Sequence, residues 1–175
     1  MSVLVPILIV LVTVLAMEGI AYSVHRWIMH GPLGWGWHKS HHEDTHGVFE
    51  KNDLYAVVFA VISILIFALG SAWWPWLWWV AVGATVYGVI YFVVHDGLVH
   101  QRWPFRYVPR RGYFRRLYQA HRLHHAVEGR DDCVSFGFVY APPVDDLKAR
   151  LKASGVLEKR QSQHRDAWRS DRVEE

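Results

Sequence analysis

The spacing of the histidines is the feature that most constrains this chain. Ten of its twelve histidines fall into two copies of one pattern, a pair separated by four residues and then the motif H-x2-H-H. The two copies consist of His25, His30, His38, His41 and His42, and of His95, His100, His121, His124 and His125. A duplicated arrangement of this kind predicts one shared role for all ten side chains.

The H-x2-H-H motif turns three imidazoles toward one side of an α-helix. Each residue turns the helix by about 100°, so the second and third histidines lie roughly 60° to one side and 40° to the other side of the first. Neutral imidazole is the commonest metal ligand in proteins. Ten imidazoles exceed what one metal holds, so the pattern predicts two metals. For one histidine taken alone, an ordinary hydrogen-bonded polar role is the alternative.

The ligand types leave the metal open. Imidazole suits iron, zinc and copper alike. The chain has a single cysteine, Cys133, which argues against a structural zinc site of the cysteine-rich kind. It also excludes a disulfide within the chain.

The histidine pairs separated by four residues need a special backbone. In a straight α-helix, a side chain five positions further along points about 140° away from the first. His25 and His30 therefore cannot share a face, and the same holds for His95 and His100. We therefore expect one member of each pair to lie beyond a helix end, or a bulge to correct the phase.

Two long apolar blocks predict an all-α integral membrane protein with about three to four transmembrane helices. The first, from Val3 to Val24, has one charged residue and lacks the positive leading region of a signal peptide. The second, from Leu54 to Val94, has no charged residue over 41 residues. A helix of about 20 apolar residues crosses a bilayer, so the second block suffices for two spans. Pro75, among five tryptophans, marks the turn between them.

These spans predict an orientation in the membrane. Both histidine groups emerge on one side, and all 19 lysines and arginines, beginning with Arg26, lie on that side too. By the positive-inside rule this side is cytoplasmic. We therefore expect a cytoplasm-facing histidine site and a cytoplasmic C-terminus.

Glu18 is the one charged residue of the first apolar block. It precedes His25 by seven residues, so it projects from nearly the same face of the helix, two turns deeper in the membrane. Ionisable residues inside membrane segments are usually functional. A role in helix packing near the membrane edge is the alternative.

The region after the last span is basic. Six arginines between Arg102 and Arg116 favour attraction to anionic lipid headgroups, with docking of an acidic electron donor as the alternative. Nucleic-acid binding is poorly supported, because no nucleic-acid module accompanies these arginines. The apolar residues Val134 to Pro143 are too few to span, and we expect them to lie in the membrane interface or to line the site.

The C-terminal part of the chain is dominated by charged residues. From Val144 onward the pattern predicts a helix interrupted near Ser154 and Gly155, followed by a solvated tail. We divide the chain into a membrane-embedded domain, residues 1–152, and a charged tail, residues 153–175.

Four segments carry a resemblance to a known family: HRWIMHG, WHKSHHE, HDGLVHQRW and AHRLHH. They resemble the histidine boxes of the membrane oxygenases in the fatty acid hydroxylase superfamily, and within it those of the bacterial β-carotene 3-hydroxylases. The likeness continues into YVPRRGYFRRLYQAHRLHH and EGRDDCVSFGFVYAPPVDDL and covers roughly Glu18 to Lys152. Desaturases, sterol oxidases and alkane hydroxylases also have histidine boxes, so the short chain and the HDGLVH context narrow the resemblance.

The resemblance implies a non-haem di-iron monooxygenase of the bacterial inner membrane. The ten box histidines would hold two irons, with O2 as co-substrate and a ferredoxin-type protein as electron donor. The reaction would hydroxylate C3 of each β-ionone ring and convert β-carotene through β-cryptoxanthin to zeaxanthin. Because this substrate is apolar, we expect it to enter from the lipid phase. Glu18, Glu43 and Asp96 are candidates to orient the imidazoles through hydrogen bonds.

Other functions remain open at this stage. A carotenoid ketolase acting at C4 or a lipid-chain hydroxylase would share the metal ligands and differ in pocket shape. A non-catalytic metal-binding or transport protein fits less well, because Leu54 to Val94 has no ionisable residue along its spans. His46 and His164 fall outside the duplicated pattern, and we expect neither to bind metal.

Overall fold

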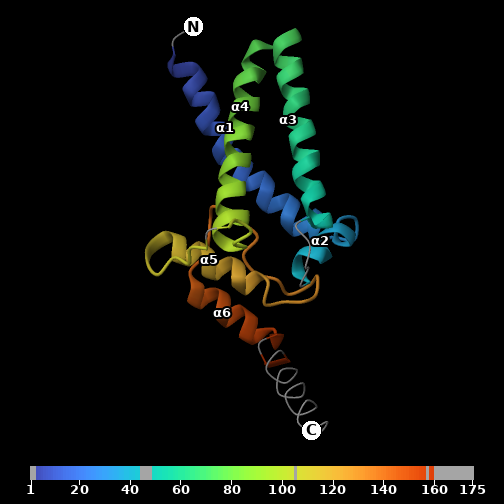
Figure 1. Ribbon diagram of the computed structural model, residues 1–175, viewed down its shortest axis with the longest axis vertical. Helices are drawn as coiled ribbons and strands as arrows, with labels where there is room; N and C mark the ends of the chain where they lie inside the picture. The colour runs from blue at the N-terminus through green and yellow to red at the C-terminus, as the bar shows by residue number, and fades with distance from the viewer. Residues whose placement is uncertain (1–2, 44–48, 105, 157, 160–175) are drawn as a thin grey trace.

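Every regular element is a helix in the part of the chain that the computed structural model describes, residues 3–43, 49–104, 106–156 and 158–159 (Figure 1). The prediction of an all-α protein is confirmed. In chain order the elements are α1 (Leu4–Ser23), η1 (Val24–Met29), α2 (Trp35–His42), η2 (Lys51–Asp53), α3 (Leu54–Ala72), α4 (Pro75–Tyr91), η3 (Phe92–Val99), α5 (Gly112–His124) and α6 (Val144–Ala153).

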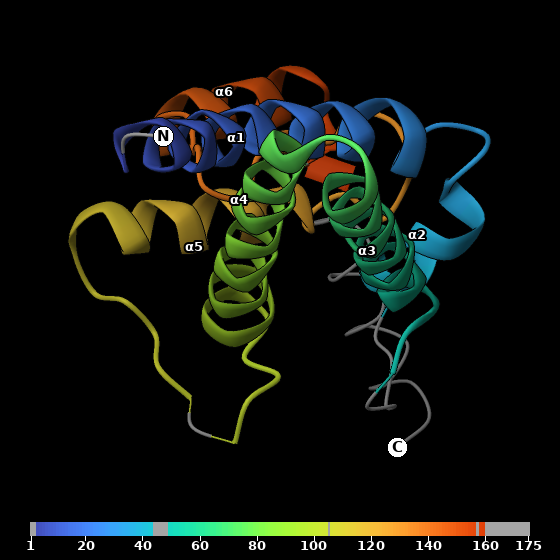
Figure 2. The same cartoon turned by 90° about the horizontal axis from the view of Figure 1, so that it is seen from above.

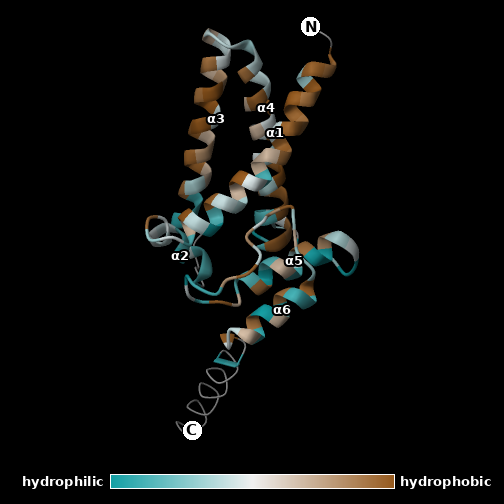
Figure 3. Ribbon diagram, turned by 180° about the vertical axis from the view of Figure 1, so that it is seen from behind, coloured by the Kyte–Doolittle hydropathy of each residue, from teal (hydrophilic) through white to brown (hydrophobic). Residues whose placement is uncertain are grey.

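Three helices are long and apolar enough to cross a membrane, and they run over Leu4–Met29, Lys51–Ala72 and Pro75–Val99. Their outward surfaces are rich in apolar residues, as the brown segments of Figure 3 show. The second and third spans form the predicted hairpin, since α3 ends at Ala72 and Pro75 opens α4. The protein is therefore a membrane protein with three spans.

Small residues bring these spans close together. A Cβ atom placed on Gly83 of α4 would lie 2.6 Å from the Cβ of Thr13 in α1. Between the two arms of the hairpin, a Cβ on Gly70 of α3 would lie 2.6 Å from the backbone nitrogen of Trp78 in α4. The glycines thus permit the close helix packing that stabilises membrane bundles.

The first and third spans both end in π-helix, η1 and η3. The amide of His30 donates to the carbonyl of His25 at 3.0 Å, and the amide of His100 donates to the carbonyl of His95 at 2.9 Å. A hydrogen bond to the fifth residue back widens the turn, so residues five apart come to lie on one side. The expected phase correction within the two histidine pairs is confirmed.

The remaining helices gather at one end of the spans. In Figure 1, α2, α5 and α6 lie below the three long helices, and Figure 2 shows α5 and α6 lying across the direction of α3 and α4. Leu147 and Leu151 of α6 are fully buried against Leu117 and Ala120 of α5. The apolar contact between α5 and α6 forms a small core that supports the histidines of α5 from below.

The helix end predicted near Ser154 and Gly155 is confirmed. Helix α6 ends at Ala153, and Gly155 follows with a φ of +74°, a left-handed conformation that favours glycine. Most of the predicted tail, residues 153–175, lies outside the described residues, so the domain boundary stays a prediction.

Candidate metal centre

The ten histidines of the duplicated pattern converge at the lower end of the spans. They come from the two π-helices and the residue after each, from α2, and from the end of α5. All have buried or half-buried side chains. Segments far apart in the sequence, at residues 25–42 and 95–125, therefore build one site.

Four of these side chains form what we call the first histidine group. Their ligand atoms all lie within 4.8 Å of one another, and the members are His25, His30, His38 and His124. The Nε2 atom of His38 lies 3.1 Å from that of His25 and 3.1 Å from that of His30. The Nε2 atoms of His30 and His124 are also 3.1 Å apart.

A second histidine group lies beside the first. Its members are His41, His95, His100 and His121. The Nε2 atoms of His41 and His95 are 3.1 Å apart, and those of His100 and His121 are 3.0 Å apart.

Each histidine group contains one histidine from the other copy of the sequence pattern. His41, from the first H-x2-H-H motif, belongs to the second group, and His124, from the second motif, belongs to the first group. Within one motif the middle histidine points about 60° to one side of the first, while the last points about 40° to the other side. One helix face therefore serves two neighbouring groups.

Hydrogen bonds to the other ring nitrogen set the tautomer of the first group. The Nδ1 atoms of His25, His30 and His124 donate to backbone carbonyls, those of Phe136, Arg130 and Val134, at 2.8–2.9 Å. The Nδ1 of His38 donates to Oδ1 of Asn52 at 2.8 Å. Since these partners are acceptors, the proton sits on Nδ1 and each Nε2 carries a lone pair.

Carboxylates replace carbonyls around two members of the second group. His41 donates from Nδ1 to Glu50 at 2.9 Å, and His95 donates from Nδ1 to Asp96 at 2.7 Å. Carboxylate partners make an imidazole a more basic ligand. The two groups therefore offer electronically different surroundings.

This donor set fits a metal. Lone pairs on Nε2 atoms 3.0–3.1 Å apart repel one another unless a cation lies between them. Two nitrogens that each lie about 2.1 Å from one metal, at right angles, are about 3 Å from each other. Burial keeps the rings neutral, as ligands must be: burial lowers the pKa of His38 to about 3, and burial together with neighbouring imidazoles lowers the pKa of His41 and His121.

The last two histidines of the pattern, His42 and His125, border the two groups. The ring of His42 is centred 5.0 Å from those of His30 and His124. Its Nδ1 donates to the carbonyl of Val127, and its buried Nε2 has no hydrogen-bond partner among the described residues. The Nε2 of His125 lies 2.9 Å from that of His121. The structure thus brings together all ten predicted histidines, whereas His46 and His164 lie outside the described residues.

Only one of the three acidic residues expected to orient imidazoles contacts a histidine in the described structure. Asp96 does so, through His95. Glu43 follows α2 in an extended conformation that takes it into solvent, where it pairs with Lys39 at 3.2 Å. Glu18 instead binds a loop that lies between it and the histidines. The expectation that Glu18 and Glu43 contact imidazoles is therefore wrong.

Glu50 and Asn52 are the site residues that the sequence analysis missed. Both belong to the short segment that leads into the second span, where Glu50 and Asp53 also form a reciprocal capping box around η2. The signal available in the sequence was the polar run E-K-N-D immediately before an apolar block, a helix-start pattern. This pattern predicts where the helix starts, but it does not predict that Glu50 and Asn52 contact histidines.

Cys133 lies near His42 and His124, and the ligand atoms of these three side chains are within 4.8 Å of one another. Burial, with Asp131 and Asp132 nearby, raises the pKa of its thiol to about 12. The thiolate is the form that binds metals. The thiol of Cys133 therefore stays protonated unless a metal beside it displaces the proton.

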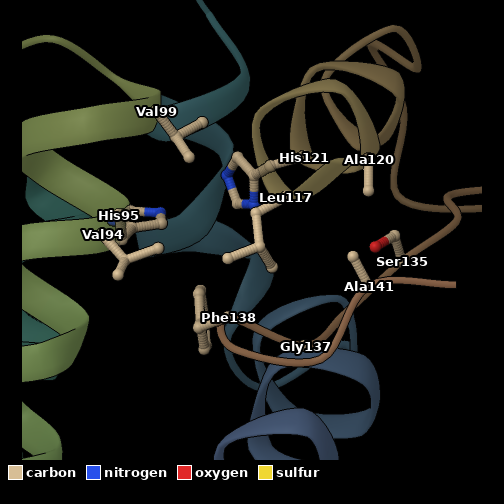
Figure 4. A pocket seen from close by; sticks show the side chains of 10 residues that line it. All are labelled: Val94, His95, Val99, Leu117, Ala120, His121, Ser135, Gly137, Phe138 and Ala141. Carbon is tan, nitrogen blue, oxygen red and sulfur yellow. The ribbon is translucent and has the colours of Figure 1, made fainter. Parts of the chain in front are cut away.

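The apolar segment from Val134 to Pro143 lines the site. Phe136 and Phe138 are buried, and their rings contact those of His25 and its neighbours. Figure 4 shows Phe138, Leu117 and Val94 around a small cavity beside His95 and His121. The segment was expected either to lie in the membrane interface or to line the site, and its phenylalanines line the site.

Comparison with known proteins gives the same family as the sequence motifs. The family model described as fatty acid hydroxylase matches residues 10–147. A beta-carotene hydroxylase of Paracoccus sp. (strain PC1) is 77% identical over 150 residues, which cover 86% of this chain and 93% of that protein. The beta-carotene hydroxylase of Pantoea ananas is 64% identical over 146 residues, which cover 83% and 82% of the two chains.

More distant relatives and solved structures complete the comparison. The chloroplastic beta-carotene hydroxylase 1 of Capsicum annuum is 38% identical over 148 residues, which cover 82% of this chain and 44% of that protein. No solved structure matches the chain significantly. On the family match and these identities, the chain belongs to the fatty acid hydroxylase family and, within it, to the β-carotene hydroxylases.

Proposed function

We propose that this protein hydroxylates C3 of the β-ionone rings of carotenoids and converts β-carotene through β-cryptoxanthin to zeaxanthin. The observation that carries the proposal is the pair of buried histidine groups, with unprotonated Nε2 atoms facing one another at the end of three membrane spans. The relatives' name, beta-carotene hydroxylase, supports the choice of substrate.

We assign two irons to the ten histidines. The first histidine group with His42 would hold one iron, and the second histidine group with His125 would hold the other. Zinc has no redox chemistry, so iron suits an oxidation better. When bound, the two irons supply the activation of O2 that breaking an unactivated C–H bond requires.

The chain itself prepares the site in three ways. The carbonyl, amide and carboxylate acceptors hold each Nδ1 proton and so fix the rings in their ligand orientation. Burial of the histidines excludes water from around them. The position at the end of the spans lets an apolar, extended substrate arrive sideways from the bilayer, so the choice of C3 depends on how the ring is held.

The proposal extends to partners and orientation. The first of the lysines and arginines is Arg26, and those described lie toward the histidine end of the spans. This distribution supports a cytoplasm-facing site in a bacterial inner membrane, where a ferredoxin-type protein would deliver electrons. We further assign the catalytic domain to residues 1–152 and a separate charged tail to residues 153–175.

The test is conversion by purified protein in lipid nanodiscs with β-carotene, a reduced ferredoxin and 18O2. The expected products are β-cryptoxanthin and then zeaxanthin, with 18O in the hydroxyl groups. Protein reloaded with ferrous iron should be active, and protein reloaded with zinc should be inactive. Ketone products would favour a ketolase, and hydroxyl oxygen that comes from water would rule out an oxygenase.

A further inference from the structure

The half-buried carboxylate of Glu18 binds a loop and contacts none of the ten histidines in the described structure. Its Oε1 accepts the backbone N–H groups of Phe138, Val139 and Tyr140 at 3.1, 3.0 and 2.8 Å. Its Oε2 accepts the hydroxyl of Tyr87 at 2.6 Å. A Cβ atom on Gly137 would lie 2.7 Å from Oε1, so the loop approaches the carboxylate as closely as a backbone can.

The part of this loop that Glu18 binds, residues 138–140, lies farther back along the spans than the histidines, whereas Val134 and Phe136 accept hydrogen bonds from histidine rings. Glu18 precedes His25 by seven residues and Tyr87 precedes His95 by eight, on spans that run toward the site. At about 1.5 Å per residue, both side chains start about 10–12 Å farther back along their helices than the histidines. Figure 1 shows the loop, in orange, rising beside the lower end of α4.

Non-helical backbone at this depth needs partners from the protein, because the bilayer core offers no water. The three consecutive amides that Glu18 accepts are groups of this kind. One anionic side chain satisfies all three, which gives a physical reason for a carboxylate in an otherwise uncharged span. Glu18 therefore allows residues 134–141 to enter the bundle from below.

The depth of the loop decides where Phe138 lies. Its ring stacks on His25 of the first histidine group, with centroids 5.1 Å apart and planes 9° from parallel. It meets His95 of the second group edge-on at 5.2 Å and Tyr91, one turn deeper, at 4.7 Å. Phe138 thus covers both histidine groups on the side that faces the bilayer interior.

We propose that Phe138 determines which ring carbon is hydroxylated, and that Glu18 and Tyr87 position it for this purpose. The inference rests on the proposed carotenoid hydroxylation. The cavity beside Phe138, His95 and His121 has room for at most about one water molecule. A β-ionone ring that comes from the bilayer enters only when Phe138 turns aside, and its phenyl ring then packs against the substrate and sets its position.

The first experiment compares Phe138→Leu with Tyr140→Leu in nanodiscs supplied with β-carotene. Tyr140 belongs to the same loop, but its side chain is 63% exposed, which makes it a matched control. Phe138→Leu should keep its iron, and the ratio of C3 to other ring-hydroxylated products should fall by about tenfold, the size expected from a changed apolar contact. Tyr140→Leu should keep the wild-type ratio. Unchanged C3 selectivity in an iron-loaded Phe138→Leu protein overturns the inference.

The second experiment tests positioning with Glu18→Gln and with the milder Tyr87→Phe, which removes one hydrogen bond to Glu18. Both should shift the product ratio in the same direction as Phe138→Leu while iron per chain is retained. The double variant Glu18→Gln/Phe138→Leu should shift it no further than Phe138→Leu alone, because the residues act through one another. If Glu18→Gln does not fold, Tyr87→Phe decides. A folded, iron-loaded variant with wild-type products, or additive shifts, refutes the positioning role.

The wild-type protein separates this inference from the proposed function. If the wild-type protein converts no carotenoid, the proposed function fails. If it forms zeaxanthin while Phe138→Leu forms the same products, only the inference fails.

Discussion

The position of one proton on each imidazole decides what the histidine groups can bind. An acceptor beside Nδ1 keeps the proton there and leaves Nε2 free to ligate. Backbone carbonyls perform this role for His25, His30 and His124, whereas Glu50 performs it for His41 with a negative charge. Side chains that never reach the metal therefore control how tightly it is held.

We predict that Glu50→Gln weakens iron binding about tenfold, the lower end of the range for lost partners of ligand histidines. The change keeps the shape of the side chain but removes the charge that accepts the Nδ1 proton of His41. Titration of purified protein with ferrous iron against a competing chelator measures the effect. Glu43→Gln is the control, since Glu43 is exposed and pairs with Lys39. Equal iron affinity in the two variants would contradict the assigned role of Glu50.

At the scale of helices, the two π-helices connect membrane span and metal site. An α-helix carried past residue 25 would turn His30 away from His25, and the wider turn of η1 returns it. The same device recurs in η3 for His95 and His100. Because both spans end in this way, each holds a pair of imidazoles at the end of a helix and not on a loop.

Packing between α1 and α4 sets the distance between the two histidine pairs, and Gly83 lies at a close contact between these helices. We predict that Gly83→Ala lowers the melting temperature of the purified protein and reduces bound iron, because the new Cβ would lie 2.6 Å from the Cβ of Thr13. The cost of such overpacking is about 1–3 kcal/mol. Gly88→Ala is the matched control in the same helix, where a Cβ meets nothing within 4 Å. If both alanine variants melt alike, the close contact does not matter.

At the scale of the whole molecule, the helices that carry the site gather at one end of the spans, opposite the α3–α4 turn (Figure 1). We predict that this end and the C-terminus are cytoplasmic and that the turn at Trp73 and Trp74 faces the periplasm. Reporters fused after Glu175 test this: a cytoplasmic reporter should be active, and a reporter that works only in the periplasm should be silent. The reverse result would overturn the orientation.

Much of this architecture follows from the sequence. Uninterrupted apolar blocks leave a helix as the only stable way to cross a bilayer, so the spans and the turn at Pro75 were predictable. The spacing of His25 and His30 excluded a straight helix between them, and the structure supplies the π-helix. The roles expected of Glu18 and Glu43 at the imidazoles were wrong, because a side chain's direction along a helix does not reveal which loop comes between it and its target.

The sequence by itself predicted that ten histidines belong to one site at the end of apolar spans, and it determined that two of their pairs need an irregular helix. Only the tertiary structure decided how they divide. His41 and His124 each join the group of the other copy, and Glu18 binds amides 120 to 122 residues away. Local spacing fixes directions within one helix, whereas these partners depend on how separate helices and the loop at residues 134–141 pack together, which no periodicity records.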